Sequence, residues 1–261
     1  MRYEMIASLQ NPQVKMWRSL MKSRAARKGC GLFLAEGEHM TAEAIQENKA
    51  SALIVSQHLL DKYEALISSA SCSSIYLVND AIMEALCDTK TPQGIAALCA
   101  YPDETLSPSG DLLVALEGVQ DPGNVGTILR SMDASGFSGL LMDGKTADPY
   151  APKTLRASMG SVFRIPAVRY ADLGAALDAL AAEGYAIAAG DLRGDPLFAR
   201  PALGQKVCLL IGNEGAGLSP AILEKATHRV KIPMIGRAES LNAAVAASIL
   251  MYDVLRERAT G

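Results

Sequence analysis

The spacing of hydrophobic and polar residues divides the chain into two series of alternating strands and helices. In the first series, short apolar runs typical of buried strands lie at 32–34, 53–55, 75–78 and 95–99. Helical patterns separate them at about 38–48, 57–69 and 80–88. The second series predicts strands at 111–117, 139–142, 185–189, 206–211 and 229–232. Its helices are expected at 124–135, 171–183, 219–226 and 240–257.

The pattern also predicts domain boundaries and a fold class. A polar, turn-rich stretch separates the two series, so we expect an N-terminal domain at 1–101, a linker at 102–110 and a C-terminal domain at 111–261. Apolar strands that alternate with helices indicate an α/β fold with a mainly parallel sheet covered on both faces. The final helix, Leu241 to Arg256, is almost wholly apolar until Tyr252, so it must be buried in the core or against another subunit.

Composition narrows the class of protein. Hydrophobic residues make up 49% of the 261 residues, which suits a globular protein with a substantial core. The longest apolar runs have fewer than ten residues, whereas a bilayer-spanning helix needs about 20. The five cysteines are odd in number and form no Cys-x-x-Cys pair, which favours reduced thiols over disulfides or a zinc site. No secretory signal opens the chain, so we expect a cytoplasmic protein without membrane or metal.

Charge is distributed unevenly. The net charge is −3, but residues 1–30 carry seven basic residues against Glu4 alone, a net +6, which leaves −9 on the other 231 residues. A basic segment on an acidic body could contact phosphates. It could equally be a solvated helix face, and the sequence leaves both interpretations open.

Three loops that follow predicted strands are unusual in composition. Ligands bind beyond the carboxyl ends of parallel strands, so such loops are candidate sites. The first runs from Gly118 to Arg130; Asn124 could cap the following helix. Arg130 lies near the start of a helix, where a positive charge is disfavoured by the helix dipole, so no local interaction explains it. The alternative is a surface arginine that pairs with a carboxylate.

The second loop spans 212–220 and has three glycines in six residues, so its backbone can approach a ligand closely. Glu214 would repel a phosphate there, which favours a neutral or cationic ligand. Ser219 and Pro220 are typical of a helix start. In the third loop, at 233–242, Ser240 is a plausible helix cap, whereas Asn242 has no comparable structural reason.

Competing motifs are weak. There is no G-x-x-x-x-G-K-[ST] sequence, so a P-loop kinase or GTPase is not expected. The first loop and Asp143 resemble a Rossmann turn, which keeps a nicotinamide-dependent oxidoreductase as an alternative, although the glycine spacing does not match G-x-G-x-x-G. The three histidines, His39, His58 and His228, are scattered and are interpreted as structural.

Together the three loops resemble the motifs of the SpoU (TrmH-like) branch of the SPOUT RNA 2'-O-ribose methyltransferases. The matching segments are Asn124-x-Gly126-x-x-x-Arg130, the run from Ile211 to Leu218, and Ile232-Pro233-Met234 through Ser240-Leu241-Asn242. Residues 156–161 are similar to the middle section of that family. Residues 31–37 are similar to the start of its ribosomal-protein-like accessory domain, which binds RNA.

The resemblance implies a C-terminal SPOUT α/β knot, with a trefoil-knotted sheet, and a smaller N-terminal α/β domain that binds substrate RNA. It also implies a homodimer and S-adenosylmethionine as cofactor. By position, the cofactor would contact Gly190, Gly212, Ile232 and Leu241. The active-site positions would be Asn124, Arg130, Glu214, Ser240 and Asn242. Arg130 resembles the residue that activates the ribose 2'-hydroxyl, or it could bind the adjacent phosphate.

The resulting hypothesis is a methyltransferase that acts on a ribose 2'-hydroxyl in structured RNA, with ribosomal RNA favoured by the accessory domain and the basic segment. A transfer RNA ribose methyltransferase is the near alternative. A non-catalytic RNA-binding protein that retains the fold is the alternative from another class. The sequence does not identify the nucleotide that would be modified.

Overall fold

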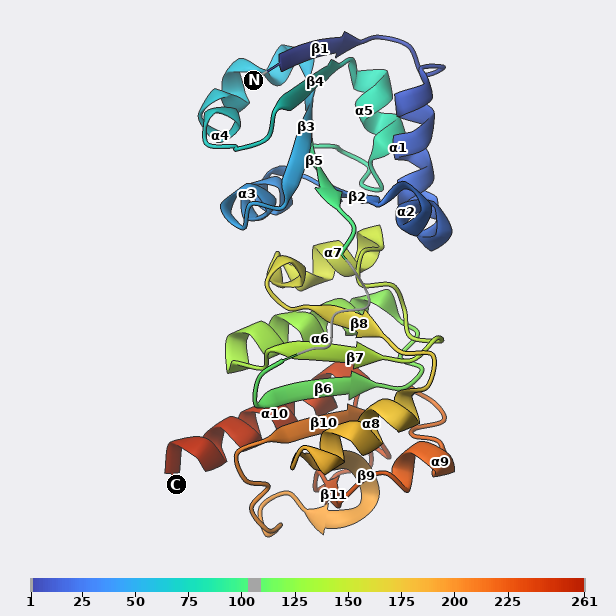
Figure 1. Ribbon diagram of the computed structural model, residues 1–261, viewed down its shortest axis with the longest axis vertical. Coiled ribbons are helices and arrows are strands. Elements are labelled where there is room, and N and C mark those ends of the chain that lie inside the picture. The colour runs from blue at the N-terminus through green and yellow to red at the C-terminus, as the bar shows by residue number, and fades with distance from the viewer. Residues whose placement is uncertain (1, 103–108, 261) are drawn as a thin grey trace. The chain divides into compact units, whose positions relative to one another are not determined.

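The structure is a computed structural model that describes residues 2–102 and 109–260, which form two compact units (Figure 1). The first unit comprises residues 2–102 together with 150–163, and the second comprises 109–149 with 164–260. Most of the expected linker, residues 103–108, lies outside the described residues. The chain therefore leaves the first unit, builds part of the second, and returns to the first before completing the second.

The first unit is a five-stranded mixed sheet with helices on both faces. The strand order is β1-β4-β3-β5-β2, with β1, β4 and β3 parallel to one another and β5 antiparallel to both of its neighbours. The strands are β1 (Arg2–Ile6), β2 (Leu32–Glu36), β3 (Ala50–Ser56), β4 (Ser74–Val78) and β5 (Ile95–Ala100). The helices are α1 (Pro12–Lys22), α2 (Arg24–Cys30), α3 (Glu38–Gln46), α4 (Glu64–Ser68), α5 (Asp80–Leu86) and α7 (Pro152–Ser158). Three single 3-10 turns are η1 (Gln57–Leu59), η2 (Asp61–Tyr63) and η3 (Ser161–Phe163).

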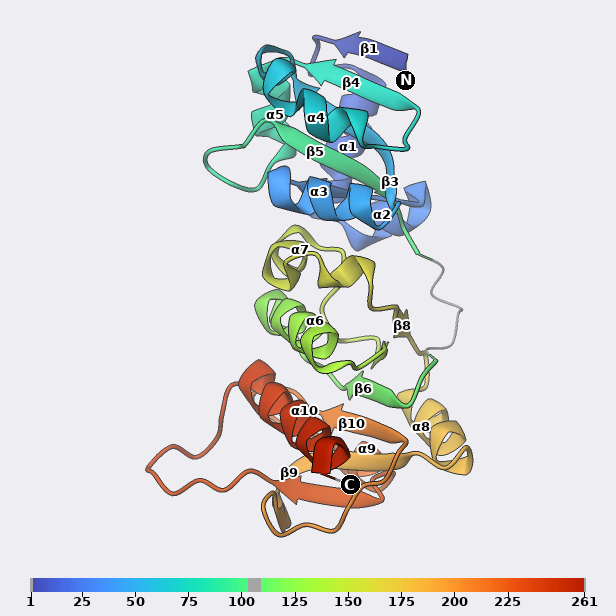
Figure 2. The ribbon, with the colours of Figure 1, turned by 90° about the vertical axis from the view of Figure 1, so that its left-hand side faces the viewer.

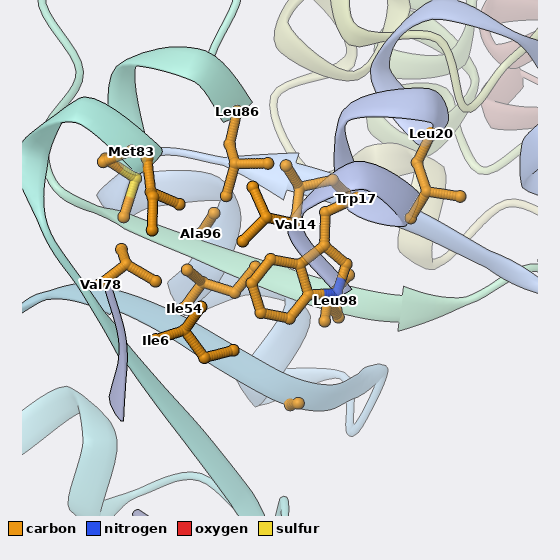
Figure 3. Close-up of a cluster of buried hydrophobic side chains, with 13 residues drawn as sticks. Ile6, Val14, Trp17, Leu20, Ile54, Val78, Met83, Leu86, Ala96 and Leu98 are labelled. Carbon is orange, nitrogen blue, oxygen red and sulfur yellow. The ribbon is translucent and has the colours of Figure 1, made fainter. Parts of the chain in front are cut away.

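Helix α1 begins and packs for reasons that are local in the sequence. The Asn11 side chain accepts a hydrogen bond from the Gln13 amide, and Pro12 occupies the first helical position. Val14, Trp17 and Leu20 then recur every three residues and point into a hydrophobic cluster on the sheet (Figure 3). The Trp17 and Tyr76 rings lie 5.0 Å apart, centroid to centroid. One face of α1 is thus buried against the sheet.

Aromatic rings hold the returning segment 150–163 in the first unit. The centroid of Phe33 lies 4.9 Å from that of Tyr150 and 6.1 Å from that of Phe163, and Tyr101 packs edge-on to Tyr150 at 4.9 Å. Tyr150 is 3% exposed and Phe163 8%. Such rings bury large apolar areas, so the segment contributes to the core of this unit.

The second unit is a six-stranded sheet in which every neighbouring pair is parallel, in the order β11-β9-β10-β6-β7-β8. Helices α6 and α10 cover one face, and α8 and α9 cover the other (Figure 2). The strands are β6 (Leu112–Leu116), β7 (Gly139–Met142), β8 (Ala167–Arg169), β9 (Ala186–Pro196), β10 (Val207–Ile211) and β11 (His228–Lys231). The helices are α6 (Pro122–Ser135), α8 (Leu173–Ala182), α9 (Pro220–Leu223) and α10 (Ala243–Thr260). The α/β prediction is confirmed, whereas the trefoil knot stays a prediction because strand order and pairing do not establish chain threading.

The last helix buries one face and exposes another. Ala244, Ala247 and Met251 of α10 are buried, but Val245 and Tyr252 on the opposite side are 47% and 51% exposed. Within the described ranges, no helix combines the length and apolar character needed to cross a bilayer. All five cysteines are free thiols.

Candidate active site

Two of the three candidate loops meet because the strands before them are neighbours. Strands β6 and β10 are adjacent and parallel, so their carboxyl ends lie side by side. The Glu117 amide donates to the Ile211 carbonyl at 3.0 Å, and Asn213 Nδ2 donates to the Gly118 carbonyl at 2.8 Å. The glycine-rich loop is thereby fastened to the loop that leads into α6.

The glycine-rich loop is a compact turn built around Asn213. Its Oδ1 accepts hydrogen bonds from the amides of Gly215 and Ala216, at 3.0 and 2.9 Å, and its backbone pairs in both directions with Gly217. A Cβ at position 212 would lie 2.4 Å from backbone atoms of Gly217 and Leu218, so only glycine fits there. Sequence reasoning missed Asn213, although asparagine is a common turn residue because its side chain can bond the backbone two residues on.

A cavity of about 500 Å³ opens beside this loop. Its wall includes all four residues expected to bind the cofactor, Gly190, Gly212, Ile232 and Leu241. Glu214 and Ser240 also line it, whereas Asn124, Arg130 and Asn242 do not. The rest of the wall is mainly apolar, from Ile211, Leu218, Leu223, Val230, Met234, Ala243, Ala246 and Leu250. The second and third candidate loops therefore share one cavity.

A bulge in β9 supplies part of the cavity wall that the sequence did not predict. Ala189 pairs with Arg229, but the next pair along β11 joins Val230 to Asp195, so five residues of β9 lie outside the ladder. Among them, Asp191, Leu192 and Arg193 line the cavity beside Gly190. The strand was expected to end at 189, where its apolar run ends, and nothing in the pattern beyond that residue signals a bulge.

Three expected active-site residues form one chain of hydrogen bonds. Asn124 Nδ2 donates to Glu214 Oε1 at 2.8 Å, and Asn242 Nδ2 donates to Asn124 Oδ1 at 2.9 Å. These side chains come from α6, from the glycine-rich loop and from the residue before α10. Asn124 therefore links the other two, and all three candidate loops are joined at this point.

Helix capping differs from the sequence prediction at two of these residues. Asp121, not Asn124, caps α6, because its Oδ1 accepts from the amides of Gly123 and Asn124. Asn242, not Ser240, caps α10, with its Oδ1 accepting from the amides of Ala244 and Val245 at 2.9 and 3.2 Å. The interpretation that Asn242 lacks a structural reason is thus wrong. Capping α10 with Oδ1 leaves its Nδ2 group for Asn124.

Glu214 is held as a carboxylate by its donors. Burial acts to raise the pKa of this carboxyl group, but hydrogen bonds from Asn124 and from the amides of Glu214, Asp121 and Gln120 outweigh it, so the pKa is lowered. At a pH above the usual pKa of a glutamate, the ionised Glu214 therefore increases the free energy of unfolding. This contribution is lost as the pH falls through the lowered pKa. At neutral pH the site carries a fixed negative charge.

Arg130 stands apart from this network. It is exposed on α6, six residues beyond Asn124 and about 120° around the helix from it. Within residues 2–102 and 109–260 its side chain makes neither an ion pair nor a hydrogen bond, so the alternative of a surface arginine with a carboxylate partner is not what the structure shows. Its guanidinium group is available to a molecule that approaches from outside.

Other candidate residues have structural roles. Asp143 Oδ1 accepts from the Gly118 amide at 3.0 Å and from the Thr146 amide and hydroxyl at 2.8 and 2.7 Å, so it is occupied in fixing the first loop. His58 pairs with Asp80, and His228 bonds Thr227. His39 lies 3.3 Å from the Met159 carbonyl. Over the described part of the chain, no group of three or more His, Cys, Asp or Glu side chains could hold a metal ion.

Comparison with known proteins agrees with this geometry. The SpoU rRNA Methylase family model matches residues 111–252, and a model described as an MRM3-like substrate binding domain matches residues 11–97. The chain therefore belongs to the SpoU rRNA methylase family.

Named relatives extend over nearly the whole chain. It is 38% identical to the 23S rRNA (guanosine(2553)-2'-O)-methyltransferase RlmP of Bacillus subtilis, covering 95% of this chain and 98% of that protein. It is 34% identical to the 23S rRNA (uridine(2479)-2'-O)-methyltransferase of Streptomyces viridochromogenes, over 96% of this chain and 92% of that one. The crystal structure of the SpoU methyltransferase AviRb from the same organism, in complex with AdoMet, superimposes with a TM-score of 0.87 at 31% identity, covering 97% and 100% of the two chains.

Proposed function

We propose that this chain transfers a methyl group from S-adenosylmethionine to a ribose 2'-hydroxyl of ribosomal RNA. The observation that carries the proposal is the glycine-lined cavity joined, through Glu214, to the Asn124–Asn242 hydrogen-bond chain. Two relatives named as 23S rRNA 2'-O-methyltransferases match this chain over 95% and 96% of its length. The N-terminal substrate-binding match accounts for the part of the chain outside the methyltransferase match.

The residues of the cavity fit the cofactor. A volume of about 500 Å³ lies within the range of small-molecule sites. Its apolar wall suits an adenine ring. Gly212 lies close to the backbone of Gly217 and Leu218, and because it has no side chain it does not cover the main-chain groups there. Glu214 places a carboxylate in the wall, which suits a sulfonium-bearing ligand. We assign Gly190, Gly212, Ile232 and Leu241 to this ligand.

The remaining site residues serve the RNA. The bound cofactor would supply an already activated methyl group, so the protein must align the attacking 2'-oxygen and remove its proton. A guanidinium group does not accept that proton, so Arg130 acts by lowering the pKa of the 2'-hydroxyl, directly or through the neighbouring phosphate, and the proton passes to solvent water. Asn124, Glu214, Ser240 and Asn242 orient the ribose and the loops. A 2'-hydroxyl target also distinguishes RNA from DNA.

Incubation of the full chain with tritiated S-adenosylmethionine tests the function. We expect label in ribosomal RNA, in a dinucleotide that resists alkaline hydrolysis because its 2'-oxygen is blocked. Label in transfer RNA instead would move the substrate to the near alternative. Binding of the cofactor without transfer to either RNA, naked or in ribosomal subunits, would favour the non-catalytic alternative.

The exposed face of α10 supports a homodimer. Val245, Tyr252 and Leu255 are 47%, 51% and 36% exposed, although all three are large apolar or aromatic side chains. Arg130 lies on α6, which packs against α10 through the Ser131–Ser248 hydrogen bond at 2.7 Å. A second copy seated on α10 would therefore bring its own chain near Arg130. Sedimentation of the full chain tests this assembly, and a monomer at micromolar concentration would contradict it.

Free thiols and a ribosomal substrate support a cytoplasmic location.

Replacing Gly212 with alanine should lower the affinity for S-adenosylhomocysteine at least tenfold. The new Cβ would lie 2.4 Å from the backbone of Gly217 and Leu218, so the loop that lines the cavity must shift. Gly215→Ala is the matched control, because a Cβ there meets only Asn213 Oδ1 at 3.7 Å, an ordinary contact. Calorimetric titration of both variants measures the difference. Equal affinities would show that the loop does not shape the binding site.

A further inference from the structure

Three basic residues form a row on the solvent side of α1. Lys15, Arg18 and Lys22 are all exposed. Their spacing of three and four residues places them within about 60° of the helix circumference, rising about 4.5 and 6 Å along the axis. We call these three residues the α1 basic row. The opposite side of the helix is fixed by Val14, Trp17 and Leu20, which are buried in the sheet cluster (Figure 3).

The structure gives this row no internal role. In the described ranges 2–102 and 109–260, none of its three side chains makes an ion pair or a hydrogen bond. No Asp or Glu occurs between residues 5 and 35, and the first turn of α1 has no acidic residue. Lys22 near the helix C-terminus is favoured by the helix dipole, but Lys15 near the N-terminus is opposed by it. A stability role alone therefore does not explain the row.

We propose that the α1 basic row binds phosphates along one strand of an RNA stem, as a contact separate from the methyl-transfer site. Cations on long side chains a few ångströms apart match the closely spaced phosphates of a duplex. The apolar side of α1 is buried in the core, so the helix itself has no free apolar face with which to enter a membrane surface. RNA is thus favoured over an anionic lipid surface. The inference deepens the proposed function and rests on its RNA substrate.

The α1 basic row explains a charge pattern that the site alone does not. The chain carries a net charge of −3, yet residues 1–30 carry +6. Three of the seven basic residues in this segment lie on one side of α1, which gives a local attraction for RNA in a protein that would otherwise repel it. Because such contacts are with phosphates, they should add affinity without adding sequence preference.

The test compares the full chain with two triple variants that lose the same charge. The first is K15Q/R18Q/K22Q. The control is K49Q/K145Q/K206Q, which removes three exposed lysines from other parts of the chain. The probe is a fluorescein-labelled RNA hairpin with a GC-rich stem, titrated at several KCl concentrations. Thermal unfolding confirms that both variants fold, as expected because all six positions are exposed and glutamine is a good helix former at the three positions in α1.

We expect K15Q/R18Q/K22Q to bind the hairpin at least about tenfold more weakly, with a salt slope reduced by about 2 to 3, since each phosphate that is no longer neutralised lowers the slope by about one. The control should stay within about twofold of the unaltered chain. Affinity for S-adenosylhomocysteine should not change in either variant. Equal weakening in both variants, no hairpin binding by the unaltered chain, or an equal weakening of binding to phosphatidylserine vesicles would each overturn the proposal.

Failure of this inference is distinguishable from failure of the proposed function. If the unaltered chain methylates RNA and K15Q/R18Q/K22Q binds the hairpin as tightly, the row has no such role and the function stands. If hairpin binding depends on the row but no RNA is methylated by the unaltered chain, the RNA contact stands and the proposed reaction does not.

Discussion

Arg130→Ala is expected to lower the rate of methyl transfer at saturating substrates by at least about a hundredfold, the size of effect seen when one group that stabilises transition-state charge is removed. Arg130 is exposed, has no partner within the described residues, and lies outside the cavity wall. Its side chain can therefore serve the incoming RNA without supporting the cofactor or the fold. Affinity for S-adenosylhomocysteine should stay within a few-fold, and single-turnover kinetics with calorimetry measure both quantities.

Arg130→Lys tests whether a positive charge at this position is sufficient for methyl transfer. A lysine keeps the positive charge but loses the planar two-pronged donor geometry. Substantial recovery of the rate would favour binding of the neighbouring phosphate as a point charge. No recovery would mean that the planar donor geometry is required, either for two bonds to the phosphate or for a directed bond to the 2'-hydroxyl. If Arg130→Ala weakened cofactor binding as much as catalysis, the residue would belong to the cofactor site and our assignment would be wrong.

Asp253→Ala should destabilise the second unit by about 3 kcal/mol, because it removes the main partner of a buried cation. Arg200 donates to Asp253 Oδ2 from Nε at 2.9 Å and from Nη2 at 2.6 Å, and both side chains are at most 5% exposed. Glu257 remains at 2.8 Å from Arg200, which keeps the loss at the low end of the range for broken buried pairs. Thermal unfolding should show a midpoint lower by about 6–12 °C.

Arg256→Ala is the matched control for this network. Arg256 also bonds Asp253, at 2.9 Å, but its side chain is 61% exposed, so its loss should cost less than about 1 kcal/mol. If the unfolding midpoint fell no further for Asp253→Ala than for Arg256→Ala, the buried ion pair would contribute little to stability. Asp253 lies one helical turn beyond Leu250, which lines the cavity, so a saturating cofactor should raise the unfolding midpoint of the unaltered chain and of both variants.

Long apolar runs made much of the second unit predictable. Strands at 112–116, 139–142 and 207–211 are buried along their whole length, and burial on both faces is what a continuous apolar run encodes. β1, α1, α2, α7 and β8 were not predicted. β1 is mostly exposed and, among the residues that the structure describes, pairs with β4 alone, so its stability comes from distant residues rather than from its own pattern. α1 did carry readable signals, in the Asn11-Pro12 cap and the Val14, Trp17 and Leu20 spacing.

The candidate site was predictable to the extent that sheet topology decides it. Loops after parallel strands gather at one edge, and the structure places Gly212, Ile232 and Leu241 around one cavity. The sequence could not show which asparagine caps a helix and which reaches across to another loop. That choice depends on the positions of Asp121 and Glu214 in space. Neither Asn124 nor Ser240 is the helix cap that the sequence predicted.

The returning segment 150–163 also has a consequence for how the protein can be assembled on the ribosome. Phe33 and Tyr101 leave the exit tunnel long before Tyr150 and Phe163, yet the four rings belong to one core. The part of the first unit that ends at residue 102 therefore keeps some of its apolar surface uncovered until some sixty further residues have been translated. A fragment that stops at residue 102 would remain in that unfinished state, and any graft of this N-terminal unit onto another enzyme would need to carry the later segment with it.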